Sequence, residues 1–357
     1  MDAPSAPAAA ALRADADAWD RFVAASPRGA YLQLSAWAQV KAVNGWWAQR
    51  VVIDTPAGPL GGQLLVHRVA GTPWAVGYMP RGPLAPDDAG ATEIAAFTGA
   101  LRALARSERL SHVTIDPEVE EGSPLADHLA TAGWRPTGHV QPDRTRVIDL
   151  GRPEAELWSE LRKKWRQYVN GAQRAGVEVR EADGSALDDF YAILADTGRR
   201  AGFIHRAPSA YRDVWEAYAS RGLARLLFAE LADGTRAAVL MLLGCGRRVV
   251  EPYGGMTDAG AAARANYLLK WEAIRSSNAA GFGVYDMWGL ANPGIEHFKA
   301  GFGGREVRYI GAWELVTQPF AHRLVLAAQD VRVRWALLRH AARRRGEDRA
   351  GAPGPGA

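Results

Sequence analysis

A chain of 357 residues with 48% hydrophobic and 23% charged residues is globular and long enough for two cores of ordinary domain size. The net charge of +4 permits a polyanionic partner without identifying one. Because residues 1–20 lack a basic stretch before an apolar core, and no apolar run approaches about 18 residues, we expect a cytoplasmic protein with neither an export signal nor a membrane span.

The first half of the chain is predicted to fold as three strands, a helix and a fourth strand. Apolar runs between Pro/Gly turns indicate the strands, and helical spacing of apolar residues indicates the helix. The expected strands are Trp47–Ile53, Leu60–Arg68, Pro73–Met79 and His112–Asp116, and the expected helix is Ala91–Arg106.

A basic helix is predicted in the middle of the chain, over Glu154–Ala175. Its apolar residues keep helical spacing and the pattern ends at Gly176. The opposite face carries Arg162, Lys163, Lys164, Arg166 and Arg174. These charges form either a solvated helix face or a contact for nucleic-acid phosphates, which favour clustered Lys and Arg.

The second half repeats the order of elements found in the first. The expected strands are Ala224–Leu231, Arg236–Leu243, Val249–Tyr253 and Val284–Trp288, and the expected helix is Ala262–Ala279. An antiparallel meander continued through a helix is typical of the mixed sheet of α+β acyltransferases. We therefore predict an α+β fold of two tandem GNAT-like (acyl-CoA N-acyltransferase) domains, with mixed sheets flanked by helices.

Cysteine and histidine usage indicates neither a disulfide nor a metal. The single cysteine, Cys245, lies in an apolar run and is interpreted as a core residue of a protein in a reducing compartment. The eight histidines are scattered, without a Cys pair or a His-x-x-x-His spacing. No metal and no cofactor are expected.

The C-terminal segment predicts a basic amphipathic helix followed by a tail. Residues 318–345 are expected to pack on the first domain or to touch an anionic membrane surface or RNA. Residues 346–357 are rich in Gly and Pro and are expected to be disordered. The predicted domains are therefore 1–150, with the C-terminal helix returning to it, and 151–317.

Six short stretches carry a resemblance to a known family when they are read in order. They are Gln33–Lys41, Gln141–Thr145, Thr197–Phe203 with Arg206 and Tyr211, Tyr253–Gly255, Tyr285–Gly289 and His297–Gly304. Together they resemble the Fem family of non-ribosomal peptidoglycan aminoacyltransferases, from about Tyr31 to Leu324. That family's fold is a pair of acetyltransferase-like domains, which agrees with the repeat. No heptad run lies between Gly176 and Tyr253, so the chain is similar to members without a coiled-coil arm.

The resemblance implies transfer of an amino acid from aminoacyl-tRNA to the stem-peptide amine of a peptidoglycan precursor, which is a lipid-linked or UDP-linked muramyl pentapeptide. It implies that Lys299 stabilises the oxyanion formed during this reaction. The implied substrate-binding residues are Lys41 and Arg206 for the diphosphate, Tyr211 and Tyr253 lining the precursor site, and Asp286, for which a turn cap or an ion pair is the alternative. In the predicted basic helix, Arg162, Lys163, Lys164 and Arg166 are the candidate tRNA contacts because clustered Lys and Arg suit phosphates.

Three other functions remain open on the sequence. An ordinary N-acyltransferase would use acyl-CoA, although the turn Gly255–Arg264 lacks the closely spaced glycines usual for CoA. A Fem-like enzyme of another biosynthetic pathway would keep the fold and change the acceptor. A non-catalytic protein that binds precursor or RNA would keep the fold without turnover.

Overall fold

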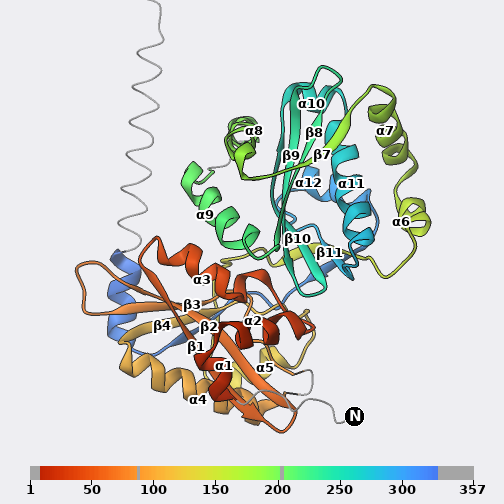
Figure 1. Cartoon of the computed structure of the whole chain (residues 1–357). Helices are drawn as coiled ribbons and strands as arrows, with labels where there is room; N and C mark the ends of the chain where they lie inside the picture. Colours follow the sequence, from red (N-terminus) through yellow and green to blue (C-terminus); the bar gives the residue numbers. More distant parts are fainter. Residues whose placement is uncertain (1–8, 87–88, 202–204, 329–357) are drawn as a thin grey trace, which may run out of the picture.

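The computed structural model describes residues 9–86, 89–201 and 205–328. Two lobes, each built on one sheet, are stacked on each other (Figure 1). The tail expected at 346–357, and the part of the expected C-terminal helix beyond residue 328, lie outside the described residues. No helix among the described residues has the length and apolar character needed to cross a membrane.

The first lobe is built on a six-stranded mixed sheet with the order β1-β2-β3-β4-β13-β5. Its strands are β1 (Trp46–Thr55), β2 (Gly58–Arg68), β3 (Ala75–Met79), β4 (Leu110–Ile115), β13 (Trp313–Val316) and β5 (Arg135–Pro136). The first three are antiparallel, and α4 (Ala91–Ser107) then carries the chain to β4, which is parallel to β3. The predicted order of three strands, a helix and a strand is confirmed.

The second lobe is built on a seven-stranded mixed sheet with the order β12-β6-β11-β10-β9-β8-β7. Its strands are β12 (Arg305–Arg308), β6 (Arg144–Asp149), β11 (Val284–Asp286), β10 (Arg248–Met256), β9 (Arg236–Cys245), β8 (Ala224–Glu230) and β7 (Glu178–Ala182). The helices α10 (Asp258–Ala262) and α11 (Ala265–Ala279) connect β10 to the parallel strand β11. The α+β fold with two GNAT-like units is therefore confirmed.

Two strands cross between the lobes, so the sheets do not follow the expected domain boundaries. β6 was expected to end the first domain, but it pairs with β11 and β12 in the second sheet. The residues of β13 fall within the expected second domain, 151–317, but this strand pairs with β4 and β5 in the first sheet. Each of these strands has its pairing partners far away in the sequence, and local periodicity carries no information about such partners.

The basic helix expected over 154–175 is two helices, α6 (Glu154–Glu160) and α7 (Lys163–Arg174). Leu161 and Arg162 between them have extended backbone, with ψ of 134° and 141°. The break is fixed by a tertiary contact, because the Arg162 backbone N–H donates to the carbonyl oxygen of Gly301 at 2.9 Å. The contact ties the start of α7 to the end of α12 (Pro293–Ala300).

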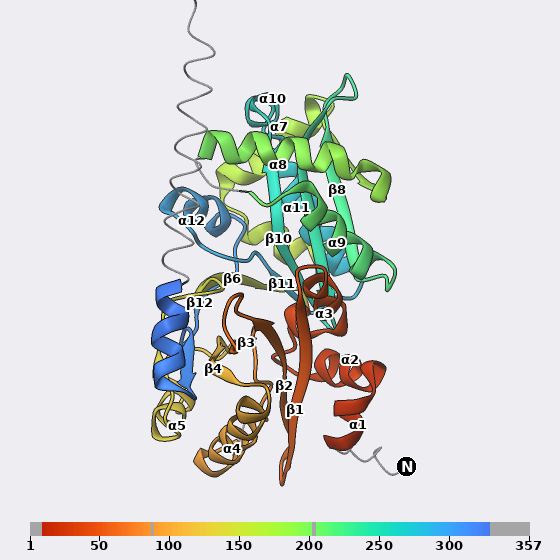
Figure 2. The same ribbon diagram turned by 90° about the vertical axis from the view of Figure 1, so that its left-hand side faces the viewer.

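A core shared by both lobes lies where they meet. Helices α1 (Ala9–Ala14), α2 (Ala16–Ala25) and α3 (Ser35–Ala42), with the short η1 (Tyr31–Gln33), pack there against α8 (Leu187–Ala201), α9 (Pro208–Ala219) and strands β8 to β10. Figure 2 shows α9 directly above α3, which it contacts. Cys245 is 3% exposed in this core, and burial raises the pKa of its thiol to about 12. This agrees with its interpretation as a core residue.

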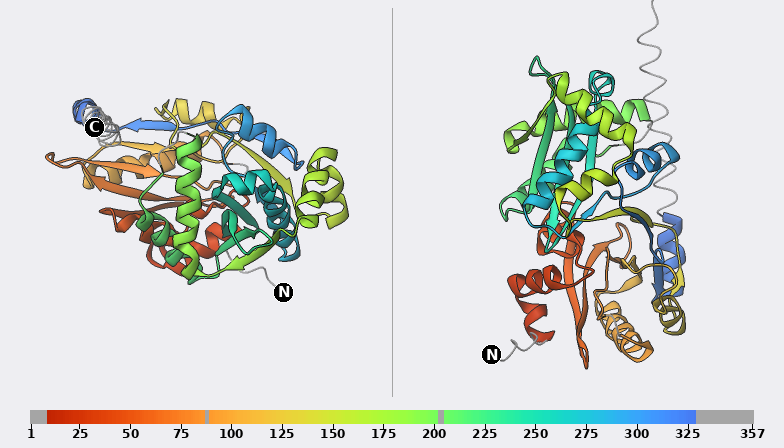
Figure 3. Two further views of the ribbon diagram at one scale, coloured as in Figure 1. Left: turned by 90° about the horizontal axis from the view of Figure 1, so that it is seen from above. Right: turned by 90° about the vertical axis from the view of Figure 1, so that its right-hand side faces the viewer.

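The described start of the C-terminal helix, 319–328, lies on the first lobe (Figures 2 and 3). Ala321 and Val325 are buried, and Val325 packs against Val69 and Val76. On the opposite face of this sheet, α4 and α5 (Leu125–Thr131) cover strands β1 to β4. The chain therefore returns to its first sheet after completing the second.

Candidate active site

Aromatic side chains line the seam between the two lobes. Tyr31, at the start of η1, is buried, and its ring centroid lies 5.9 Å from Trp37, 6.0 Å from Tyr218 and 5.7 Å from Trp288. Tyr31 and Trp37 belong to the first lobe, whereas Tyr218 lies on α9 and Trp288 follows β11. Because edge-on and tilted aromatic contacts are favourable in addition to the area that they bury, these residues fix the wall of the seam.

Two of the predicted site residues, Tyr211 on α9 and Tyr253 on β10, meet at this wall. Their ring centroids lie 5.2 Å apart with perpendicular planes. Burial raises the pKa of Tyr253 to about 12, against the opposing effect of the Arg206 guanidinium, so the phenol keeps its proton at neutral pH. The backbone N–H of Arg206 donates to the Tyr211 hydroxyl oxygen at 3.2 Å. These three predicted residues therefore lie together.

Lys41 on α3 brings a second cation to the same place from the first lobe. Its Nζ lies 5.2 Å from the ring centroid of Trp37 and 5.9 Å from that of Trp46. Burial and the neighbouring Arg206 both lower the pKa of Lys41. Within the described part of the chain, neither Lys41 nor Arg206 has a carboxylate partner. Two cations that repel each other beside buried phenols form a place for an anion.

Lys299 lies on α12, which begins with a capping bond from the Ile295 N–H to the Asn292 side chain. The Lys299 ammonium donates to three consecutive carbonyl oxygens, those of Met287 at 2.5 Å, Trp288 at 3.0 Å and Gly289 at 2.8 Å. An ammonium has three hydrogens, so all of its donors are engaged. Burial lowers the pKa of Lys299 to about 8. In this arrangement the lysine positions the segment that carries Trp288.

Asp286 holds the same segment from the other side. It is 1% exposed, accepts from the Trp288 N–H at 2.7 Å and from the Thr145 hydroxyl, and forms an ion pair with Arg248. Burial opposes ionisation, but Arg248 and the hydrogen bonds outweigh it and lower the pKa of Asp286. Trp288 has a φ of 57°, in the left-handed region, and the hydrogen bond from its N–H to Asp286 helps to stabilise this strained backbone conformation. The geometry fits the ion-pair alternative for Asp286 rather than contact with a substrate.

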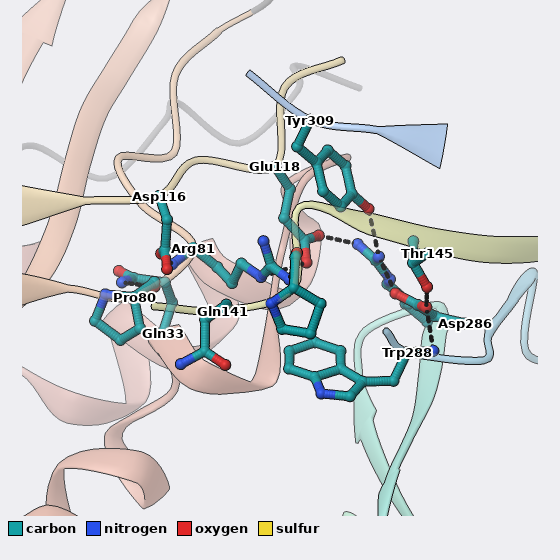
Figure 4. Close-up of polar contacts among 12 residues, drawn as sticks. Gln33, Pro80, Arg81, Asp116, Glu118, Gln141, Thr145, Asp286, Trp288 and Tyr309 are labelled. Carbon is teal, nitrogen blue, oxygen red and sulfur yellow. Dashed lines mark hydrogen bonds and ion pairs between the residues drawn. The ribbon is translucent and has the colours of Figure 1, made fainter. Parts of the chain in front are cut away.

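A buried network of charges joins the two lobes beside Trp288 (Figure 4). Arg81, which follows β3, pairs with Glu118 at 3.2 Å, and Glu118 also pairs with Arg248. Arg248 also pairs with Asp286, and its guanidinium donates to the Tyr309 hydroxyl at 3.2 Å. The Arg81 guanidinium also lies 5.0 Å from the Trp288 ring centroid. This network was not predicted from the sequence, although charged residues at the ends of strands were a signal for it.

A second buried ion pair, also missed, lies near Lys299. Lys270 on α11 pairs with Glu251 on β10, and the Tyr285 hydroxyl donates to the same carboxylate at 2.6 Å. Glu251 raises the pKa of Lys299 and Lys270 lowers it.

A cleft of about 710 Å³ opens at the seam between the lobes. It is lined by Glu118, Arg247, Arg248, Arg305 and Tyr309 among others, but by none of the predicted site residues.

The predicted tRNA contacts lie outside the aromatic seam, next to α12. Arg162, Lys163 and Lys164 are exposed at the start of α7, and Arg162 lies 3.3 Å from the His297 ring, measured from Nη1 to Nδ1. Arg166 instead donates to the carbonyl oxygens of Ser159 and Leu161. Three of the four side chains are therefore exposed to a partner, on a helix that contacts α12, which carries Lys299.

Comparisons with known proteins agree with the fold. A sequence model of the FemAB family matches residues 15–132, and a model of the GNAT acetyltransferase domain matches residues 159–300. The Lipid II:glycine glycyltransferase of Staphylococcus aureus (strain MRSA252) is 28% identical over 223 residues, which cover 59% of this chain and 53% of that protein. The chain thus spans about half the length of the curated relatives that it matches.

Solved structures share the two-lobed architecture. The crystal structure of FemX is similar with a TM-score of 0.80 at 20% identity, over 87% of this chain and 98% of that chain. The structure of L-PGS from Bacillus licheniformis is similar with a TM-score of 0.51 at 12% identity, over 88% of this chain and 96% of that chain. The chain is therefore similar to the FemAB family over residues 15–132 and to the GNAT acetyltransferase domain over residues 159–300, and it shares the fold of FemX.

Proposed function

We propose that this protein transfers an amino acid from aminoacyl-tRNA to the stem-peptide amine of a peptidoglycan precursor. The observation that carries the proposal is that Lys41 and Arg206, from different lobes, lie near enough to repel each other, with Arg206 beside the phenols of Tyr211 and Tyr253. The name of the relatives, Lipid II:glycine glycyltransferase, supports a precursor of this class as acceptor. Such precursors carry a diphosphate, which needs fixed cations.

The aromatic seam suits the remainder of such a precursor. The Tyr253 phenol can donate to a phosphate, sugar or peptide oxygen, and the faces of Trp37 and Trp288 offer apolar area to a sugar ring or a peptide. Tyr31 lies between these two indoles. A precursor bound with its diphosphate at Lys41 would extend its stem peptide along this wall toward the segment held by Lys299.

The donor would approach from the side of α7. Its exposed cations Arg162, Lys163 and Lys164 suit the phosphates of the tRNA acceptor stem. The Trp165 indole N–H donates to the carbonyl oxygen of Phe298 at 3.0 Å, which fixes α7 against α12. This contact would hold the tRNA at a set distance from the reacting centre.

Catalysis in this proposal is direct aminolysis of the ester. The neutral amine forms a C–N bond to the ester carbonyl, the C–O bond to the tRNA ribose breaks, and one amine proton ends on the ribose oxygen. The oxyanion needs a positive partner, and Lys299 is the proposed one. Because its three hydrogens are engaged, it must release one carbonyl of residues 287–289 to donate to the oxyanion.

The test is transfer of labelled amino acids from a mixed pool of charged tRNA to lipid-linked and UDP-linked muramyl pentapeptides. The full chain is compared with Lys299→Met and with Arg106→Gln, an exposed position on α4. We expect RNase-sensitive label on one precursor with the parent and Arg106→Gln, and little with Lys299→Met. Activity with acyl-CoA in place of charged tRNA would contradict the proposal and favour an ordinary N-acyltransferase.

A further inference from the structure

Two histidines and a glutamate meet under the C-terminal helix, on the first lobe and away from the seam. His112 lies on β4, Glu314 on β13, and His322 in the helix of residues 319–328. The pairing of Glu314 with Thr114, two residues from His112, puts the first two side chains on one face of the sheet. His322 reaches the same face because the helix packs there. Their side chains are 7 to 9% exposed.

The ligand atoms are close enough for one small cation to bind all three. One nitrogen from each ring and one Glu314 oxygen lie within 4.8 Å of one another. Oε2 of Glu314 is 2.7 Å from Nε2 of His322 and 3.9 Å from Nε2 of His112. Metal–ligand bonds of about 2.1 Å in a tetrahedron place ligand atoms about 3.4 Å apart, between these two distances.

Neighbouring side chains orient two of the ligands. The Ser111 hydroxyl lies 3.3 Å from the carbonyl oxygen of Ala75 and 2.9 Å from Nδ1 of His112, so when it donates to Ala75 its oxygen can accept from Nδ1–H of His112. In that tautomer Nε2 of His112, 3.9 Å from Oε2 of Glu314, offers its lone pair to a cation. Arg135 donates twice to Oε1 of Glu314, at 3.0 and 2.8 Å, and leaves Oε2 for the cation. Partners of this kind are usual behind metal ligands.

We propose that His112, Glu314 and His322 bind a divalent transition-metal ion of the zinc class, which pins the C-terminal helix to the first sheet. Two imidazoles and one carboxylate suit Zn²⁺ or Co²⁺, whereas Mg²⁺ and Ca²⁺ prefer oxygen ligands alone. Three protein ligands leave a fourth position for water. Because the ligands come from β4, β13 and the helix, bound metal stabilises the attachment of the helix without taking part in the proposed transfer.

The test uses the full chain without an affinity tag, freed of metal with a chelator and titrated with Co²⁺. We expect one ion per chain to bind at micromolar concentration, with the visible absorption of four-coordinate Co²⁺, and Zn²⁺ to displace it. Zn²⁺ is also expected to raise the Tm of the parent. A titration without saturable binding would overturn the proposal and leave the cluster as hydrogen bonds alone.

Variants distinguish Co²⁺ binding at His112, Glu314 and His322 from binding at other histidines of the chain. His322→Ala and Glu314→Gln are each expected to weaken Co²⁺ binding at least about tenfold, whereas the exposed His139→Ala should bind as the parent does. Ser111→Ala keeps all three ligands and should bind more weakly while folding normally, which covers the case in which a ligand variant does not fold. Unchanged affinity in His322→Ala would place the ion elsewhere and overturn the proposal.

Discussion

Lys41 and Arg206 are close enough to lower the pKa of Lys41, yet they come from opposite lobes. Such repulsion costs free energy in the unliganded protein and is relieved when an anion binds between the two groups. An anionic ligand therefore gains from both cations, and the two contributions depend on each other. The effects of removing Lys41 and of removing Arg206 on the free energy of ligand binding should therefore not be additive.

We expect Lys41→Ala and Arg206→Ala each to raise KM for the precursor by about 10- to 100-fold with a smaller change in kcat. One charge-assisted hydrogen bond contributes about 1.5–3 kcal/mol, which corresponds to this range. The double variant should lose less than the product of the two single effects. Steady-state kinetics with Arg106→Gln as control check this, and a fall in kcat at constant KM would exclude a role in binding.

Lys299 makes the folding stability depend on pH, and the burial of its side chain fixes the sign of this dependence. The pKa is lowered from 10.5 to about 8, so between these values the unfolded chain binds more protons than the folded one. Below pH 8 the folded protein carries the full cost of burying the ammonium. As pH rises from 8 to 10.5 this cost disappears, so the stability of the parent rises relative to Lys299→Met.

The expected relative change is about 2 kcal/mol, less than the whole shift implies because the side chain keeps some contact with solvent. Urea midpoints of parent and Lys299→Met, measured at pH 7.5, 9 and 10.5, check it. A constant difference between the two proteins across this range would show that Lys299 does not titrate there.

The sequence was informative about single residues where a family pattern exists, and uninformative where only the fold creates the contact. Lys41, Arg206, Tyr211 and Tyr253 were named in advance, and the structure brings them together. The importance of Tyr31 could not be predicted, because its ring contacts reach residues 187 and 257 positions further along the chain. No local pattern contains contacts of that range.

At the scale of elements, the contact between α7 and α12 depends on a glycine. A Cβ at Gly301 would lie 2.2 Å from Cε2 of Trp165, whose ring is packed among Tyr168, Tyr267 and His297. The indole has no room to move, so the helices would have to separate. Gly301 therefore fixes the spacing between the proposed tRNA contacts and Lys299.

Gly301→Ala is expected to lower stability by about 1–3 kcal/mol, as overpacking does, and to reduce transfer. Gly171→Ala is a matched control, since a Cβ at this position in α7 meets nothing within 4 Å and alanine favours a helix. Urea unfolding and the transfer assay check both variants. Equal stability of the two would mean that α7 and α12 can part without cost.

Element order was predictable, whereas element interruptions were not. Repeated periodicity gave the meander, helix and strand of each lobe because apolar spacing is a local property. The break between α6 and α7 depends on the bond from Arg162 to Gly301, and the break before α11 on the left-handed backbone of Arg264, with φ of 58°. The first break lies inside the run 154–175, whose apolar spacing continues as in a single helix, and the second lies at the start of the predicted helix Ala262–Ala279.

At the scale of the molecule, the two lobes are joined by charges as well as by a shared core. Arg81 and Glu118 come from the first lobe, and Arg248 and Asp286 from the second. Arg248 is the central member, because it pairs with both Glu118 and Asp286. The same residues support Trp288, so the relative position of the lobes and the shape of the aromatic seam depend on one set of contacts.

Removing Arg248 should therefore cost more than removing any one of its pairs. Arg248→Ala leaves the Asp286 carboxylate buried without its ion-pair partner and Glu118 with Arg81 alone, and breaking buried pairs in this way costs about 3–5 kcal/mol. Arg248→Met with Asp286→Asn removes one buried pair, leaves Glu118 paired with Arg81 and keeps most of the volume, so we expect a smaller loss. Urea unfolding followed by tryptophan fluorescence checks the order of stabilities. If the double variant is as unstable as Arg248→Ala, uncompensated charge is not the reason, and the guanidinium acts mainly by packing against Tyr309 and its neighbours.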